Sequence, residues 1–229
     1  MKHVSKLIHG DTDIFYGFHD FEYQLDLQGW GGHYDYFDRI IGEIKPQTII
    51  EVGSWKGKSA ITMADSCMMH RLDTEIVCVD TWLGATEFWT DHSDPKRYQS
   101  LGLKNGYPTV YYQFLANVFK TGHQDHITPF PQSSLNAARF LAKNEVKVDM
   151  VYLDGSHEYD DVLSDITAYW PLIRSGGVMV GDDYCEYWQG VIDAVTDYFG
   201  GEGVHVETET WTNEEGAPSD YWKVRKWYE

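Results

Sequence analysis

The sequence predicts an α/β fold built on a doubly wound, mostly parallel sheet of seven strands with helices on both faces. From Thr48 onward, short apolar runs alternate with longer segments whose apolar residues recur every three or four positions. Such alternation is typical of parallel strands joined by helices that pack on the sheet. The last two runs alternate between polar and apolar residues, so they predict an antiparallel hairpin at one sheet edge.

Each strand is expected where a short run is rich in apolar residues. The five parallel strands are predicted over residues 48–52, 75–80, 127–130, 148–153 and 178–180. The two strands of the closing hairpin are predicted over residues 204–210 and 221–228, where the alternation fits half-exposed strands.

The connecting helices are predicted from the spacing of their apolar residues. One helix follows the first strand and extends to about His70, and another is capped by Ser133 or Ser134. The segments 159–170 and 188–199 each repeat apolar residues every three or four positions, as a helix with one buried face does.

Two regions fall outside this alternation. Residues 1–46 are expected to form an N-terminal helical or lid segment, with one helix that ends before Pro46. Residues 82–108 have no clear period and predict an inserted loop or lid. Residues 47–229 then form the main domain, and a length of 229 residues suits a single globular domain overall.

Composition limits the classes of partner. The 36 acidic residues outnumber the 18 basic ones, and the resulting net charge of −18 disfavours binding to nucleic acid. No run approaches the roughly 20 apolar residues of a membrane span, and no apolar signal core follows the first residues. Cys67, Cys78 and Cys185 are widely spaced and are expected to be structural. We therefore expect a cytoplasmic protein that does not bind membranes.

The string "EVGSWKG", residues 51–57, lies at the first strand-to-helix turn. In a doubly wound sheet, ligands bind beyond the carboxyl ends of the strands, where this turn is expected. Gly53 permits a tight turn, and Gly57 lets the backbone approach a ligand. The second strand ends on Asp80, which can accept hydrogen bonds from ribose hydroxyls. A dinucleotide site would need G-x-G-x-x-G, and a phosphate-binding loop would need G-x-x-x-x-G-K-[ST]; the spacing here completes neither.

These residues resemble the cofactor fingerprint of the class I S-adenosylmethionine-dependent methyltransferases, whose fold is Rossmann-like. The resemblance implies that Glu51 orders the loop near the methionine amino group of the cofactor. It also implies that Gly53 and Gly57 let the loop run close to the ligand and that Asp80 binds the ribose.

The same resemblance places an adenine contact after the third strand, at "QSS". Trp82 follows Asp80 so closely that we expect it beside the cofactor as well. The complete set of expected cofactor-binding residues is Glu51, Gly53, Trp55, Gly57, Ser59, Asp80, Trp82, Gln132 and Ser133.

Carboxylates also follow two later strands. The fourth strand is followed by Asp154, and the fifth leads through Gly181 to Asp182 and Asp183. The ends of parallel strands meet at one edge of a sheet, so these side chains are expected to converge beside the first loop. Clustered carboxylates repel one another unless a cation lies among them, and oxygen ligands favour Mg²⁺, with Ca²⁺ or Mn²⁺ as substitutes. Taken singly, each residue would more often serve a turn or a helix cap than a metal site.

The three acids resemble the metal site of the cation-dependent O-methyltransferases, both the catechol type and the type that methylates sugars on macrolide and aminocoumarin natural products. The catechol type usually has Asp-Asn where this chain has Asp182-Asp183, so the sugar-modifying group is more similar. That group includes enzymes with Asp-Gly-Ser-His after the fourth strand, as at Asp154 to His157, and the histidine is their general base. Over roughly residues 47–200, the resemblance therefore implies Asp154, Asp182 and Asp183 as metal ligands, with His157 and Asp154 as catalytic residues.

These residue types suit methyl transfer to oxygen. The methyl group of a sulfonium is already activated, so the enzyme must mainly align a nucleophilic oxygen, aided by a cation and a base. We expect an S-adenosylmethionine- and Mg²⁺-dependent O-methyltransferase that acts on a hydroxyl of a small polar molecule, with sugars as one candidate class.

Two alternatives remain open. A nicotinamide-dependent oxidoreductase would share Asp80 but would need the missing glycines, and a non-catalytic ligand-binding protein would keep the fold without turnover. The aromatic stretch "GWGGHYDYF" is in addition a candidate contact with a second subunit in a homo-oligomer.

Overall fold

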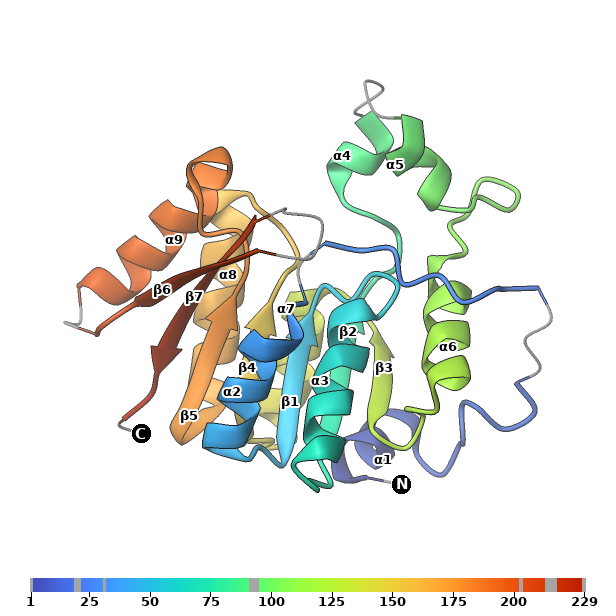
Figure 1. Ribbon diagram of the computed structural model, residues 1–229, viewed down its shortest axis with the longest axis horizontal. Helices are drawn as coiled ribbons and strands as arrows, with labels where there is room; N and C mark the ends of the chain where they lie inside the picture. The colour runs from blue at the N-terminus through green and yellow to red at the C-terminus, as the bar shows by residue number, and fades with distance from the viewer. Residues whose placement is uncertain are drawn as a thin grey trace.

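The computed structural model describes residues 2–18, 22–30, 32–90, 95–201, 204–212 and 218–227. These residues form a seven-stranded sheet in the order β3-β2-β1-β4-β5-β7-β6, with helices on both faces (Figure 1). The strands are β1 (Thr48–Val52), β2 (Glu75–Asp80), β3 (Ile127–Pro131), β4 (Val148–Leu153), β5 (Ile173–Gly181), β6 (Glu207–Thr212) and β7 (Pro218–Arg225). The helices are α1 (His3–His9), α2 (Tyr34–Ile44), α3 (Lys58–Met69), α4 (Thr86–Thr90), α5 (Pro95–Ser100), α6 (Val110–Thr121), α7 (Ser134–Lys143), α8 (Tyr159–Tyr169) and α9 (Gln189–Gly200), with 3₁₀ turns at η1 (Trp170–Leu172) and η2 (Glu186–Trp188).

The sheet topology confirms the predicted fold class. Strands β1 to β5 pair in parallel, whereas β7 is antiparallel to both β5 and β6. The direction in which successive strands are added to the sheet reverses between the neighbours β1 and β4. Open α/β sheets bind ligands at such a switch point. The hairpin is shifted from its predicted position, because pairing begins at Glu207 and Pro218 and ends at Thr212 and Arg225. Tyr228, which the sequence placed in the last strand, lies outside the described residues.

Alternate residues of each central strand point to opposite faces, so the molecule has two apolar cores. In β1, Ile50 belongs to the core that is covered by α7, α8 and α9. Its neighbour Ile49 belongs to the opposite core, which is covered by α2, α3 and α6. Both isoleucines are completely buried. Because helices cover both faces, the ends of the parallel strands are where a ligand can reach the sheet.

The N-terminal helices α1 and α2 pack on the sheet. Helix α1 places Val4 in the core, and the backbone N–H groups of Val4 and Ser5 donate to the carboxylate of Glu75. Helix α2 buries Phe37 and Ile41 against the sheet. The helix ends at Ile44, before Pro46 as the sequence predicted, and its C-cap residue Lys45 has a left-handed φ of 46°.

The inserted segment contains short helices. Residues 82–108 include α4 and α5, which stand at the top of the view in Figure 1. Helix α6, which follows the insertion, was not predicted, although it buries Val110, Phe114 and Leu115. None of the helices in the described part of the chain combines the length and the apolarity needed to cross a bilayer.

Candidate active site

The first loop owes its shape to Gly53 and to the neighbouring strand β4. Gly53 has a φ of 85°, and its N–H donates to the carbonyl oxygen of Val79 at 2.9 Å. A Cβ atom at this position would lie 2.1 Å from the carbonyl oxygen of Asp154. Glycine is therefore required by both the backbone conformation and the close approach of the β4 end. This close approach brings the first loop next to Asp154.

Gly57 has a structural role in the turn that precedes α3. It has a φ of 86° and precedes α3, and its N–H donates to the carbonyl oxygen of Ser54 at 2.7 Å. A Cβ atom here would lie 3.0 Å from the ring of Phe114 on α6. Gly57 lies outside the lining of the main cavity, so glycine serves the turn and the packing against α6.

Asp80 holds the first loop in place. Its Oδ2 accepts hydrogen bonds from the backbone N–H groups of Ser54 and Trp55 at 3.0 and 2.9 Å, and its Oδ1 accepts one from the N–H of Trp82 at 2.7 Å. Burial raises the pKa of Asp80, whereas these backbone donors lower it. Asp80 also lines the main cavity, so it combines a structural role with access to a ligand.

Trp82 supports this loop from inside the core. Its side chain is 2% exposed, packs against Phe114 and donates from Nε1 to the carbonyl oxygen of Trp55 at 2.8 Å. The cavity lining does not include Trp82. Its proximity to Asp80 in sequence reflects a shared role in shaping the loop.

Glu51 is completely buried beneath the same loop. Its Oε1 accepts a hydrogen bond from the hydroxyl of Ser59, and its Oε2 has no partner among the described residues. Burial raises the pKa of Glu51. The lining of the cavity includes Ser59 but not Glu51, so Glu51 acts from below the cavity floor.

A cavity of about 1060 Å³ opens above the ends of the parallel strands. This volume is slightly above the roughly 300–1000 Å³ that small-molecule sites occupy. The predicted site residues that line it are Gly53, Trp55, Ser59, Asp80, Gln132, Ser133, Asp154, His157, Asp182 and Asp183. Most of the expected site residues therefore line one cavity. Glu51, Gly57 and Trp82 do not line it and are buried.

The acids after β4 and β5 form one cluster. The hydroxyl of Tyr152 lies 3.0 Å from Oδ2 of Asp154 and 3.3 Å from Oδ2 of Asp182. Loss of solvation raises the pKa of Asp154 well above its usual range, and the charges of Asp182 and Asp183 raise it further. Burial and the charge of Asp183 raise the pKa of Asp182 to about 7. These pKa shifts therefore reflect burial and the repulsion between neighbouring carboxylates.

A small cavity of about 20 Å³ is lined by Asp154, Asp182, Asp183 and His157, among others. Roughly 10–15 Å³ is enough to hold one water-sized species. Within the described residues, no three His, Cys, Asp or Glu side chains are already arranged as a set of metal ligands. The donor set is nevertheless of the all-oxygen kind that Mg²⁺ prefers, and its raised pKa values fit an attraction for cations.

His157 contacts the cluster through Asp183. Its Nε2 lies 2.9 Å from Oδ2 of Asp183, and its Nδ1 lies 3.8 Å from Oε1 of Glu87 on α4. Its ring stacks on Trp188. Asp183 has a φ of 63°, which is uncommon for a residue other than glycine, and its N–H donates to Oδ1 of Asp182 at 2.8 Å. Such strain is typical of positions fixed for function.

An N-terminal strap, residues 22–30, forms another wall of the cavity. Its Trp30 lies edge-on to Phe88 of α4, with ring centroids 5.9 Å apart, and 6.5 Å from Trp55 of the first loop. Arg97 of α5 lies over the ring of Trp30 at 5.9 Å. The strap, the first loop and the insertion thus meet around one aromatic cluster at the cavity.

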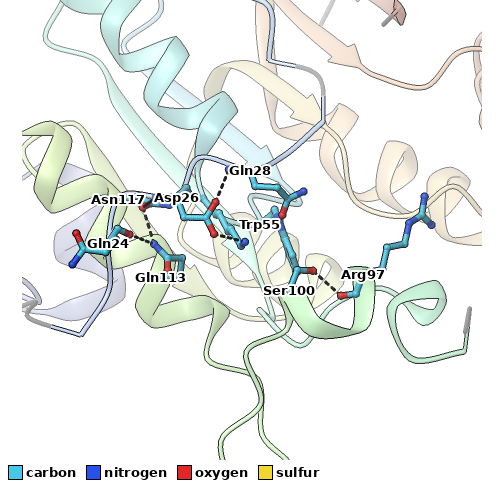
Figure 2. A network of polar contacts seen from close by, with 9 residues as sticks. Gln24, Asp26, Gln28, Trp55, Arg97, Ser100, Gln113 and Asn117 are labelled. Atoms are coloured by element: carbon cyan, nitrogen blue, oxygen red, sulfur yellow. Dashed lines mark hydrogen bonds and ion pairs between the residues drawn. The ribbon is translucent and has the colours of Figure 1, made fainter. Parts of the chain in front are cut away.

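Figure 2 shows the polar network that fixes this strap. Nζ of Lys56 pairs with Oδ2 of Asp26 at 2.6 Å, and the side chain of Lys56 is 7% exposed. The amide of the buried Asn117 on α6 donates to the carbonyl oxygens of Asp26 and Lys56 at 2.6 and 2.8 Å. Nε1 of Trp55 donates to the side chain of Gln28 at 3.3 Å. The first loop is therefore tied to both the strap and α6.

Several residues at the cavity were not identified as site residues from the sequence. Glu87 lies in the insertion without a period, and Trp188 fits the apolar face of the helix predicted over 188–199. Trp188 in fact ends η2, directly before α9, and stacks on His157. Trp30 also lines the cavity, whereas His33 and Trp89 do not.

Comparison with known proteins extends these findings. Residues 50–184, more than half of the chain, match a family model described as "Methyltransferase domain". The chain is also similar to "Uncharacterized protein R132" of Acanthamoeba polyphaga mimivirus, with 38% identity over 40 residues. That match spans only 18% of the length of either protein.

Two solved structures share the fold. An O-methyltransferase from Bacillus cereus in complex with SAH has a TM-score of 0.60 at 14% identity, over 88% of this chain and 84% of that one. CalS11, described as a TDP-rhamnose 3′-O-methyltransferase of calicheamicin biosynthesis, has a TM-score of 0.54 at 19% identity, over 84% of this chain and 76% of that one. The family match confirms the resemblance drawn from the first loop, and the chain belongs to the methyltransferase-domain family.

Proposed function

We propose that this chain is an S-adenosylmethionine-dependent and Mg²⁺-dependent O-methyltransferase that acts on a hydroxyl of a small polar molecule. The observation that carries the proposal is the meeting of two groups of residues at one cavity. The first loop, with Gly53 and Asp80, forms one side, and the cluster of Asp154, Asp182 and Asp183 with His157 forms another.

S-adenosylmethionine, when bound, supplies a methyl group activated by its sulfonium. The residues that would hold it are those of the first loop, with Asp80 toward the ribose and Gln132 and Ser133 toward the adenine. Glu51 supports this role from beneath the loop, because its buried carboxylate accepts a hydrogen bond from the hydroxyl of Ser59, which lines the cavity. The O-methyltransferase from Bacillus cereus, which has a similar fold, binds SAH, and this adds support.

A divalent cation held by Asp154, Asp182 and Asp183 would supply the positive charge that lowers the pKa of an acceptor hydroxyl. The raised pKa values of Asp154 and Asp182 support this assignment, since they result from repulsion and burial that a cation would relieve. The small cavity among these side chains adds a suitable space.

His157 is the proposed general base. If its Nε2–H is donated to Asp183, the lone pair of Nδ1 is the one that accepts a proton from the acceptor. Asp183 and Glu87 would then stabilise the resulting imidazolium, because both carboxylates lie within 4 Å of the ring nitrogens. Such a base contributes about 10²- to 10⁴-fold to the rate.

Sugars are the first acceptor class to test, because CalS11 is described as acting on TDP-rhamnose. The experiment is transfer of labelled methyl from S-adenosylmethionine to a panel of sugars, nucleotide sugars and catechols, with Mg²⁺ or with EDTA. Transfer that requires Mg²⁺ and is lost in His157→Gln is the expected result. If the protein bound NADH and not S-adenosylhomocysteine in a titration, the proposal would be wrong.

A further inference from the structure

The hydroxyl of a buried tyrosine contacts two of the proposed metal ligands. Tyr152 of β4 is completely buried, and its hydroxyl lies 3.0 Å from Oδ2 of Asp154 and 3.3 Å from Oδ2 of Asp182. Neither the small cavity nor the main one is lined by Tyr152. Its hydroxyl can therefore act on a bound ligand only through the two carboxylates.

The pairing of β4 with β5 brings these two carboxylates side by side. Leu153 pairs with Gly181, and the N–H of Asp182 donates to the carbonyl oxygen of Leu153 at 3.2 Å. Asp154 and Asp182 are thus the next residues along the two neighbouring strands. This pairing fixes the backbone of both residues, but it leaves open which rotamer each side chain adopts. Because ionised carboxylates repel each other, a further group is needed to hold them together.

The hydroxyl of Tyr152 is suited to this task. A phenol has an ordinary pKa of about 10, and burial together with the charges of Asp154 and Asp182 raises the pKa of Tyr152, so the hydroxyl keeps the proton that it donates. A neutral donor lessens the repulsion between the carboxylates without adding a positive charge that would compete with a cation. A carboxylate oxygen has two lone pairs, so an oxygen that accepts this hydrogen bond can still bind a metal ion.

The ring of Tyr152 is itself held in place. It meets the ring of Phe37 on α2 edge-on, with ring centroids 5.0 Å apart and 82° between the ring planes. Both side chains are completely buried in the core that α2, α3 and α6 cover. One acceptor is enough to satisfy a buried hydroxyl, so burial alone does not account for a second carboxylate within its reach.

We propose that Tyr152 is a positioning residue, whose hydroxyl holds the carboxylates of Asp154 and Asp182 in the arrangement that binds one divalent cation. The inference rests on the metal ligands of the proposed function, and it adds a residue that touches neither the cation nor the substrate. The hydroxyl should favour Mg²⁺ over Ca²⁺, because Mg²⁺ demands near-ideal octahedral geometry whereas Ca²⁺ accepts more flexible arrangements of its ligands.

Titration calorimetry of the metal-free protein with Mg²⁺ and with Ca²⁺ tests this inference. Tyr152→Phe keeps the ring and removes only the hydroxyl. It should weaken Mg²⁺ binding about 10- to 100-fold, the usual effect of losing a residue that orients a metal ligand. Ca²⁺ binding should weaken less, so the preference between the two ions should shift toward Ca²⁺. The affinity for S-adenosylhomocysteine, measured without metal, should stay unchanged.

Tyr221→Phe is the matched control. Tyr221 is also completely buried, and its hydroxyl accepts hydrogen bonds from the N–H groups of Gly32 and His33 at 3.1 and 3.3 Å. Within the described residues, this hydroxyl makes no hydrogen bond to Asp154 or Asp182. Tyr221→Phe should therefore bind both ions as the native protein does.

The outcomes separate the two proposals. Unchanged or tighter Mg²⁺ binding by a folded Tyr152→Phe, or an equal loss of affinity for both ions, would overturn the role of Tyr152 and leave the proposed function standing. If the native protein bound neither Mg²⁺ nor Ca²⁺, both this role and the proposed metal dependence would be wrong.

A second measurement needs no change at Tyr152. Mg²⁺ should alter the tyrosine absorption of the native protein and of Tyr221→Phe, because the cation withdraws charge from the carboxylates that accept the phenolic hydrogen bond. A tyrosine spectrum that stays the same while calorimetry records Mg²⁺ binding would overturn the role of Tyr152. The test therefore remains decisive even if Tyr152→Phe does not fold.

Discussion

The imidazole of His157 stacks on the indole of Trp188, with ring centroids 3.9 Å apart and 17° between the ring planes. This contact fixes the plane of the imidazole, and the 2.9 Å contact between Nε2 and Asp183 fixes its rotation. A general base held in this way needs little reorganisation when the acceptor binds. Trp188 is therefore a positioning residue for the proposed base.

Loss of this stacking should slow turnover more than it weakens binding. We expect Trp188→Ala to lower kcat about 10-fold and His157→Gln to lower it by about 10²-fold or more, because only the latter removes the base. The affinity for S-adenosylhomocysteine should change less than about 2-fold in both, and Trp188→Phe should restore most of kcat. Steady-state kinetics and calorimetry measure these quantities, and an equal loss of donor affinity would point to a collapsed site instead.

Mg²⁺ should stabilise the protein through the acidic cluster. At a concentration 100 times its Kd, Mg²⁺ should add about 2.7 kcal/mol to the free energy of unfolding. For a protein of this size, each kcal/mol raises Tm by roughly 2–4 °C. Thermal melts with Mg²⁺ and with EDTA should show this rise in the native protein and in Asp161→Asn, but not in Asp182→Asn. If saturating Mg²⁺, Mn²⁺ or Ca²⁺ left the Tm of the native protein unchanged, that result would contradict the proposed metal site.

Asp165 should make the stability of the apoprotein depend on pH. Its pKa is about 6 in the folded protein against 3.8 in the reference state, so between these values the folded chain binds more protons than the unfolded chain. Stability therefore falls as pH rises through this window, by about 2–3 kcal/mol in all. Asp165→Asn should raise Tm at pH 8 and have little effect below pH 4. Urea unfolding at pH 8 and below pH 4 measures the difference in stability between the variant and the native protein. A variant that is less stable than the native protein only at pH 8 would refute this prediction.

Gly53 should tolerate no side chain. Gly53→Ala would place a methyl group against the backbone of Asp154 at a positive φ, and we expect a loss of about 3 kcal/mol or more. Gly155→Ala is the matched control, because its Cβ would meet only ordinary contacts, the nearest at 3.6 Å. Chemical denaturation of the two variants makes the comparison. Similar stabilities would mean that the β1 and β4 ends separate more easily than this packing implies.

Much of the fold was predictable because its signals are local. The five apolar runs that form β1 to β5 are buried on both faces, so each one stands out in the sequence without knowledge of its neighbours. The strand ends then place Asp80, Asp154 and Asp182 at one edge of the sheet, which topology alone requires. Helix α6 was missed because it follows an insertion whose residues have no clear period.

The sequence by itself determined the fold class, the position of the first loop and the three acids that converge beside it, because periodicity and strand ends follow from the backbone geometry of each segment. Only the tertiary structure decided what each side chain touches. Gly57 packs against Phe114, Trp82 supports the loop from the core, and Trp188 stacks on a histidine 31 positions earlier in the chain. Such contacts join residues that no local pattern links, since they arise only when the helices and loops are packed around the sheet.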